Sequence, residues 1–366
     1  IAACIALPFL LLGFLPFIFQ IDFSSTDSST NFLGLQKDYL LSEFGFSTAG
    51  NIKFFDFKNV GGKTAGPFGP IAILLSLFIP FSIVLFFSVA YKQKTKNLIQ
   101  SRDDTKQLEQ EFANSLFQLG NRLGDGVPAE LAFGKVALLT QGQKSAAFFS
   151  LVNQNMQGNG MPLDRAIFDT RRGAITYFPS GLIATSMRIL IESAKKGLQI
   201  AARSLMSISE YMKNIDKINQ RLRDLLAEIV SDMKSNMVFL APLLAGIVVG
   251  LSAMITLILN KLNEIQISGD TSSIPFDVSS AFGIFDVTKM IPPYFIQISI
   301  GIYIIEIIFI LTGALVTVDS GKDVLKEKHE LAKNLKMGIL LYLFTAFASI
   351  LALSILAAVA FGGFGG

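Results

Sequence analysis

The sequence predicts an all-α membrane protein with about five transmembrane helices and a helical-bundle domain outside the bilayer. One observation is composition: 51% of the 366 residues are hydrophobic and only 16% are charged, whereas soluble domains carry about 25% charge. A second is that five apolar stretches are long enough to cross a bilayer, which takes about 20 residues per helix. A third is that one long hydrophilic stretch, residues 92–236, shows helical periodicity.

The five predicted membrane segments are almost free of charge. Glu306 is the only ionisable residue well inside any of them; the segments are 1–19, 68–91, 237–259, 292–318 and 338–361. A signal-peptide interpretation of the first segment is disfavoured, because no basic residues precede its apolar run. Since the sequence does not start with Met, we expect the natural chain to begin upstream of Ile1 or to have been processed.

The basic residues predict the orientation, because loops rich in Lys and Arg stay in the cytosol. Stretch 92–236 has 20 basic against 14 acidic residues, and stretch 319–337 has 5 against 4. Stretch 20–67 has 4 basic against 5 acidic residues, and stretch 260–291 has 2 against 4. We therefore place 92–236 and 319–337 in the cytosol, with a multi-pass chain in the cytoplasmic membrane.

Three regions follow from this topology. Residues 1–91 are predicted to form an N-terminal transmembrane helix pair with an extracellular loop, 20–67. Residues 92–236 are predicted to be the cytosolic helical domain. Residues 237–366 are predicted to hold three transmembrane helices and the cytosolic loop 319–337.

Apolar residues three and four apart predict one buried helix face at the start of the cytosolic domain: Leu108, Phe112, Leu116, Leu119 and Leu123. Near Gly124 this helix is expected to end. Gly126 and Pro128 then suit a turn and a first helical turn.

The same pattern of a glycine and a proline two residues apart recurs 34 residues later, at Gly160 and Pro162. A spacing of this size favours repeated helix–turn–helix units, although two unrelated helix starts would give the same pattern. A third glycine, Gly197, precedes a stretch that is helical by pattern to the end of segment 237–259. At 1.5 Å per residue that helix would be roughly 90 Å long, with a kink expected at Pro242.

Heptad spacing marks one side of this long helix. Seven residues separate successive members of the set Ile208, Ile215, Leu222 and Ile229, and Tyr211, Ile218 and Leu225 follow three residues later. Such a seam pairs with a second copy of the chain or packs on the domain's own helices, and the pattern fits both.

Two segments of this domain resemble a known family. They are Leu119–Phe133 (LGNRLGDGVPAELAF) and Glu192–Ala201 (ESAKKGLQIA), and they are similar to the type II secretion system F family of platform proteins. The loop Lys322–Lys336 resembles the archaeal branch of that family. The resemblance covers about 92–361, and its family-motif residues here are Gly126, Pro128, Gly160, Pro162 and Gly197. Archaeal members often have a further cytosolic region upstream, which again suggests an incomplete N-terminus.

The resemblance implies a platform in the membrane for a type IV pilus or archaellum. Its implied partners are a cytosolic hexameric secretion ATPase, which powers assembly, and pilin-like or archaellin subunits. A homodimer is the family expectation. No cofactor is expected.

Catalytic constellations are absent from the sequence. A single His, His329, cannot form a multi-His metal site. Cys4 lies in a predicted membrane segment and His329 in a charged loop, so the two are not expected to form a catalytic pair. The run Val60–Thr64 superficially resembles a phosphate-binding loop, but Phe57 stands where the first glycine is required. We therefore expect a protein that is not an enzyme.

Three sets of residues are candidates for interaction. Basic residues that could dock an acidic ATPase surface, or lie near anionic lipid headgroups, are Arg171, Arg172, Lys195, Lys196, Arg221 and Arg223. Their mixture with acids argues against nucleic acid. Gly246 and Gly250 predict close helix packing, within the chain or between subunits. Glu306 could accept a hydrogen bond across helices or contact the N-terminal helix of a pilin, but we favour a structural glutamate bonded to Tyr303 or Ser299.

Two other function classes fit the topology. A solute transporter would need paired broken helices, and the membrane segments hold few polar residues. A membrane sensor would need an extracellular ligand-binding fold, for which stretch 20–67 is small. A neighbouring gene for a secretion ATPase would favour the platform over both.

Overall fold

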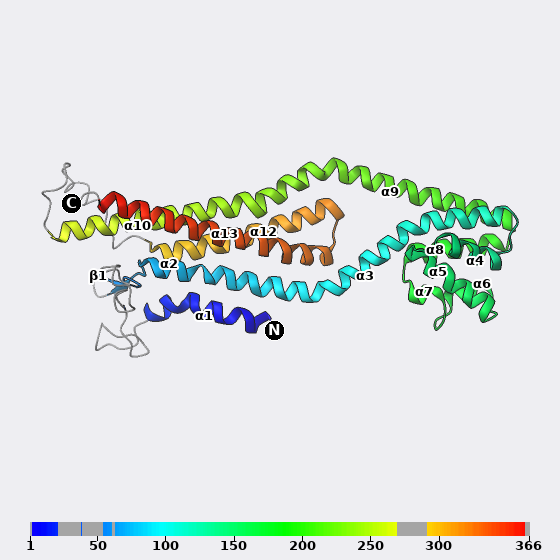
Figure 1. Ribbon diagram of the computed structural model, residues 1–366, viewed down its shortest axis with the longest axis horizontal. Coiled ribbons are helices and arrows are strands. Elements are labelled where there is room, and N and C mark those ends of the chain that lie inside the picture. Colours follow the sequence, from blue (N-terminus) through cyan, green and yellow to red (C-terminus); the bar gives the residue numbers. More distant parts are fainter. Residues whose placement is uncertain (1, 21–37, 39–53, 61–62, 269–290, 363–366) are drawn as a thin grey trace. The chain divides into compact units, whose positions relative to one another are not determined.

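The computed structural model describes residues 2–20, 38, 54–60, 63–268 and 291–362. The chain divides into two compact units, which are described separately. Residues Ile1–Thr95 and Ile229–Gly366 form the first, called the membrane unit, and Lys96–Glu228 form the second, called the helical unit. Helices dominate both units (Figure 1).

Among the described residues, five helical stretches are long and apolar enough to cross a membrane, which agrees with the predicted number. The first is α1 (Ala2–Gln20), and the second is α2 (Pro70–Ser76) followed by α3 (Phe78–Gly124). The third is α9 (Leu198–Ser235) with η4 (Asn236–Leu240) and α10 (Ala241–Ser268). The last two are α12 (Pro293–Ser320) and α13 (Val324–Gly362). The core of the membrane unit includes Ile304, Ile308 and Tyr342.

The predicted loop 319–337 is mostly helix, because α12 continues to Ser320 and α13 begins at Val324. Gly321, with φ +73°, ends α12. Asp323 then starts α13, since its carboxylate accepts the Lys326 N–H at 3.1 Å. His329 therefore lies on a helix, where its Nδ1 is 3.4 Å from the Thr95 hydroxyl.

The predicted long helix contains one irregular turn. From Leu198 to Ser268 the chain is helical throughout, but η4 is a π-helical turn in which the Ala241 N–H donates to the Asn236 carbonyl. Pro242 follows directly and cannot donate a backbone hydrogen bond. A π-helical turn next to this proline therefore takes the place of the single uninterrupted α-helix that was expected.

Gly246 and Gly250 pack against α13 within the same chain. A Cβ on Gly246 would lie 2.7 Å from the Ala346 backbone nitrogen, and one on Gly250 would lie 2.9 Å from the Ser349 carbonyl carbon. The two backbones approach this closely only because both positions lack a side chain. Of the two packing modes that the sequence left open, the structure contains the one within the chain.

The predicted extracellular loop 20–67 lies largely outside the described residues, as does most of 260–291. Near the end of loop 20–67, β1 (Lys58–Val60) pairs antiparallel with β2 (Lys63–Ala65). This hairpin is an addition to the all-α prediction. Lys63 and Thr64 lie in a strand, whereas a phosphate-binding loop would place them at the start of a helix.

The helical unit is built on the second half of α3. Around it lie α4 (Ala129–Leu139), α5 (Lys144–Asn153), the π turn η3 (Gln154–Gly158), α6 (Leu163–Phe168), α7 (Ala174–Tyr177), α8 (Gly181–Ala194) and the first half of α9. The predicted apolar face of α3 is buried, since Phe112, Leu116, Leu119 and Leu123 are completely inaccessible and Leu108 nearly so. These side chains form the core together with Phe133, Phe148 and Phe149.

The two similar glycine–proline segments share only their helix starts. Gly126 and Gly160 both have positive φ, +82° and +62°, and Pro128 and Pro162 are the N-caps of α4 and α6. The prolines thus stand one residue before the first helical turn. However, α4 has 11 residues and α6 has 6, so the two segments are followed by helices of different length, and the repeat stays a prediction. Gly197, with φ +125°, precedes α9 as expected.

Candidate functional site: the basic face of the helical unit

Five of the exposed basic residues near the helices α6 and α8 either follow α6 or lie on or after α8, and we call this set the basic face. Its members are Arg171, Arg172, Arg188, Lys195 and Lys196. Two of them follow α6 in a loop, one lies in the middle of α8, and two follow the end of α8. The sequence identified four of the five.

The loop after α6 is fixed by a carboxylate and an amide. Asp169 Oδ1 accepts the backbone N–H groups of Arg171 and Arg172 at 2.8 and 2.9 Å. From the π turn η3, the buried Asn155 amide donates to the carbonyls of Ala166 and Arg172 at 3.1 and 2.7 Å. These bonds hold the loop backbone, so both arginine side chains project from a defined support.

Hydrogen bonds from the backbone N–H groups of Arg172 and Arg171 lower the pKa of Asp169 below its usual value. The carboxylate therefore remains charged at neutral pH. The Asp169 oxygen accepts hydrogen bonds from uncharged backbone N–H groups and not from the guanidinium groups. The loop is therefore held in place while the positive charges of Arg171 and Arg172 stay available to a partner.

Lys195 at the end of α8 is paired with an acid. Its Nζ lies 2.8 Å from a Glu192 carboxylate oxygen, and this hydrogen bond and the Glu192 charge raise the pKa of Lys195. The negative charge of Asp164, in α6, adds a smaller effect in the same direction. Because both partners are exposed, the ion pair contributes little to stability. Lys195 is therefore less available to a partner than Lys196.

Arg188 was missed by sequence reasoning. It is exposed on α8, and its guanidinium carbon lies 5.6 Å from the centre of the Phe168 ring at the end of α6. That distance is suited to a cation–π contact, which orients the guanidinium without neutralising it. The sequence spacing could have identified Arg188, since Arg188 and Lys195 are seven residues apart and therefore lie on the same side of a helix.

Arg221 and Arg223 are exposed on α9. Within the described residues, no hydrogen bond, ion pair or cation–π contact joins them to α6 or α8, so the structure does not bring all six predicted docking residues into one cluster.

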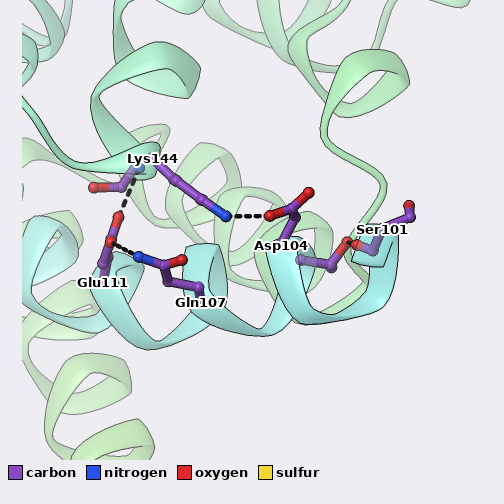
Figure 2. A network of polar contacts seen from close by, with 7 residues as sticks. Ser101, Asp104, Gln107, Glu111 and Lys144 are labelled. Carbon is purple, nitrogen blue, oxygen red and sulfur yellow. Dashed lines mark hydrogen bonds and ion pairs between the residues drawn. The ribbon is translucent and has the colours of Figure 1, made fainter. Parts of the chain in front are cut away.

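Acidic residues of α3 fix the helices that support the basic face. Glu111 accepts the Ser145 N–H at 3.2 Å, in the first turn of α5 (Figure 2). The Ser115 and Ser145 hydroxyls lie 3.0 Å apart. Lys144 pairs with Asp104, which lies about two turns before Glu111 on α3. Ser180, the N-cap of α8, donates to Glu109 at 2.5 Å and accepts the Ile183 N–H. Negative charge at these N-termini also complements the helix dipoles.

The heptad seam on α9 is largely uncovered. Ile208 packs against the core of the helical unit, but Ile215, Leu222 and Ile229 are 40%, 51% and 53% exposed, as are their companions Tyr211, Ile218 and Leu225 to a similar or greater degree. Of the two interpretations of the seam, packing on the domain's own helices applies only to Ile208.

Glu306 lies on the outward side of α12. The side chain is exposed, and no hydrogen bond or ion pair reaches its carboxyl group from any residue that the structure describes. Its expected bonds to Tyr303 and Ser299 are thus not present there.

Comparison with known proteins gives no relative for this arrangement: no family model, no curated protein and no solved structure matches the chain.

Proposed function

We propose that this chain is a non-enzymatic platform of a type IV pilus-like or archaellum assembly machine in the cytoplasmic membrane. A cytosolic hexameric ATPase docks on the helical unit, and pilin-like or archaellin subunits are held by the membrane helices. The short segments 119–133 and 192–201, which resemble the type II secretion system F family, support this assignment.

Helix continuity is the observation that carries the proposal. The helix α3 runs unbroken from Phe78 to Gly124, and the chain is helical from Leu198 to Ser268 through α9, η4 and α10. Each stretch contains an apolar span and also contributes to the core of the helical unit. Two helices that each continue from an apolar span into the helical unit suit a protein that passes force from an ATPase to the bilayer.

The basic face supports ATPase docking. Positive side chains held on a defined loop and helix steer and orient an acidic partner. Anionic lipid headgroups would attract the same charges, so the experiment must separate these two partners.

The test is co-purification of the full-length tagged protein from its native cells in mild detergent. We expect a secretion ATPase and pilin-like proteins among the recovered proteins. The double substitution Arg171→Glu and Arg172→Glu should reduce recovery of the ATPase at least tenfold and leave the pilin-like proteins unchanged.

The matched control is Lys135→Glu with Arg203→Glu, two exposed basic positions on α4 and α9. This variant has the same change in net charge, so it should retain the ATPase. Equal loss in both variants would indicate a general effect of net charge on ATPase binding and discard the docking face. Full retention of the ATPase by the Arg171→Glu, Arg172→Glu variant would leave lipid headgroups as the partner of these charges. Recovery of neither partner by the intact protein would favour a transporter or a sensor.

A further inference from the structure

Helix α12 has two chemically different sides. One side is buried in the membrane unit through Ile304, Ile305 and Ile308. The other side carries a line of exposed residues with polar groups, Ser299, Tyr303 and Glu306, which we call the α12 stripe. Intervals of four and three residues place them on one face of the helix. Because the opposite side is packed into the core, α12 cannot rotate to bury the stripe.

Glu306 stands in the middle of the 28-residue helix α12. If α12 crosses the bilayer, this position is far from either headgroup region. A carboxyl group in hydrocarbon is costly, and such residues normally face a bundle interior or pair with another polar group. In the described part of the chain Glu306 does neither, so its partner must come from outside these residues.

We propose that the α12 stripe binds a membrane-spanning helix of another protein, one that presents a hydrogen-bond donor side chain at the depth of Glu306. The carboxyl group accepts from that donor, and the Ser299 and Tyr303 hydroxyls extend the polar contact along the helix. Polar side chains that bond across helices drive association within a bilayer, where apolar side chains have no such preference over lipid.

Complementarity favours such a helix over a second copy of this chain. Two copies in one membrane are related by an axis along the bilayer normal. A dimer in which the two α12 stripes face each other across that axis would place acid against acid and the Tyr303 ring against another tyrosine. The inference rests on the proposed function, because it names where the assembling subunit would be held.

The test uses the full chain in lipid vesicles with synthetic transmembrane peptides as probes. Cys4 is the only cysteine and is exposed, so it accepts a fluorescent donor without any substitution. One acceptor-labelled peptide is a leucine–alanine helix with a single central asparagine, and the other is the same helix without it. Energy transfer at low peptide-to-lipid ratio then measures binding.

We expect the asparagine peptide to bind about threefold to fivefold more tightly than the apolar one. Glu306→Ala should abolish this preference, and Glu306→Gln, which keeps an acceptor oxygen, should retain most of it. Ile310→Ala is the matched control, since it removes only apolar surface from the same exposed side of α12, and it should keep the preference. Thermal unfolding should be the same for all three variants.

Equal binding of the two peptides by the wild-type chain would overturn the proposal, as would a preference that survives Glu306→Ala. Energy transfer between labelled copies of the chain that disappears in Glu306→Ala would show that a second copy occupies the stripe, and would also overturn it. The ATPase plays no part in this assay. Failure of ATPase co-purification is therefore distinguishable from failure of the stripe.

Discussion

At the scale of single residues, carboxylates of the helical unit bind backbone or hydroxyl groups at the starts of helices and turns. Glu111 accepts a backbone N–H in the first turn of α5, Glu109 accepts the hydroxyl of the α8 N-cap, and Asp169 accepts two N–H groups after α6. Each carboxylate satisfies a donor that a helix start or turn would otherwise leave unpaired. The basic face depends on these groups although none of them belongs to it.

The first prediction concerns Glu111. Glu111→Ala removes the acceptor of the Ser145 N–H, and we expect the start of α5 to lose about 1 kcal/mol of local stability. Hydrogen exchange of the first α5 amides in the full-length protein should accelerate roughly fivefold. Gln107→Ala is the control, because Gln107 contacts only the other Glu111 oxygen, at 3.1 Å. Equal exchange in the two variants would contradict the assigned role of Glu111.

The second prediction is a pH dependence at Asp169. The backbone N–H groups of Arg172 and Arg171 lower the pKa of the Asp169 carboxyl in the folded protein. The charged Asp169 therefore contributes its full stabilisation at pH values above the pKa that this carboxyl has in the unfolded chain. That contribution is lost as pH falls through the lower, folded pKa. Hydrogen exchange of the 169–173 loop, corrected for intrinsic rates, should therefore rise in strong acid. Asp169→Asn keeps an acceptor oxygen but cannot titrate, so its loop should show no such rise. Identical pH profiles would refute the assignment.

At the scale of elements, the α10–α13 contact depends on two glycines, and it yields the third prediction. Gly250→Ala would place a Cβ 1.9 Å from the Ser349 hydroxyl and 2.9 Å from its carbonyl carbon. Overpacking of this kind costs about 1–3 kcal/mol, so the melting temperature in detergent should fall. Gly313→Ala on α12, whose nearest neighbour would be a flexible Glu327 oxygen at 3.5 Å, should leave it unchanged or raise it. A fall in both variants would show a general intolerance of these helices to alanine.

The uncovered seam of α9 gives the fourth prediction, also at the scale of elements. Leu222 and Leu225 are 51% and 76% exposed, so Leu222→Lys with Leu225→Lys should leave thermal unfolding of the chain unchanged. If the seam joins two copies, cross-linking between copies in the membrane should fall several-fold, because lysines at adjacent core positions of a coiled coil repel. Unchanged cross-linking would exclude the seam from any dimer.

At the scale of the whole molecule, hydropathy predicted the five apolar helices, and apolar residues three and four apart predicted the buried face of α3. Both patterns can be recognised within a single helix. The start of α13 at Val324 was missed, since a charged segment of a helix resembles a loop in hydropathy. Nothing in the sequence showed that Glu306 faces outward or that Gly250 meets Ser349. Those facts depend on which helix packs beside which, and one sequence does not specify that.

The proposed platform unites the three scales: capped helices hold the basic face, two long helices lead to the apolar spans, and the α12 stripe offers a site inside the bilayer. The most direct test of the central claim is electron microscopy of surface filaments in native cells from which the gene has been deleted. We predict cells without the filament, with full restoration by the wild-type gene and none by the Arg171→Glu, Arg172→Glu variant. Filaments of normal number and length in the deletion strain would contradict the account.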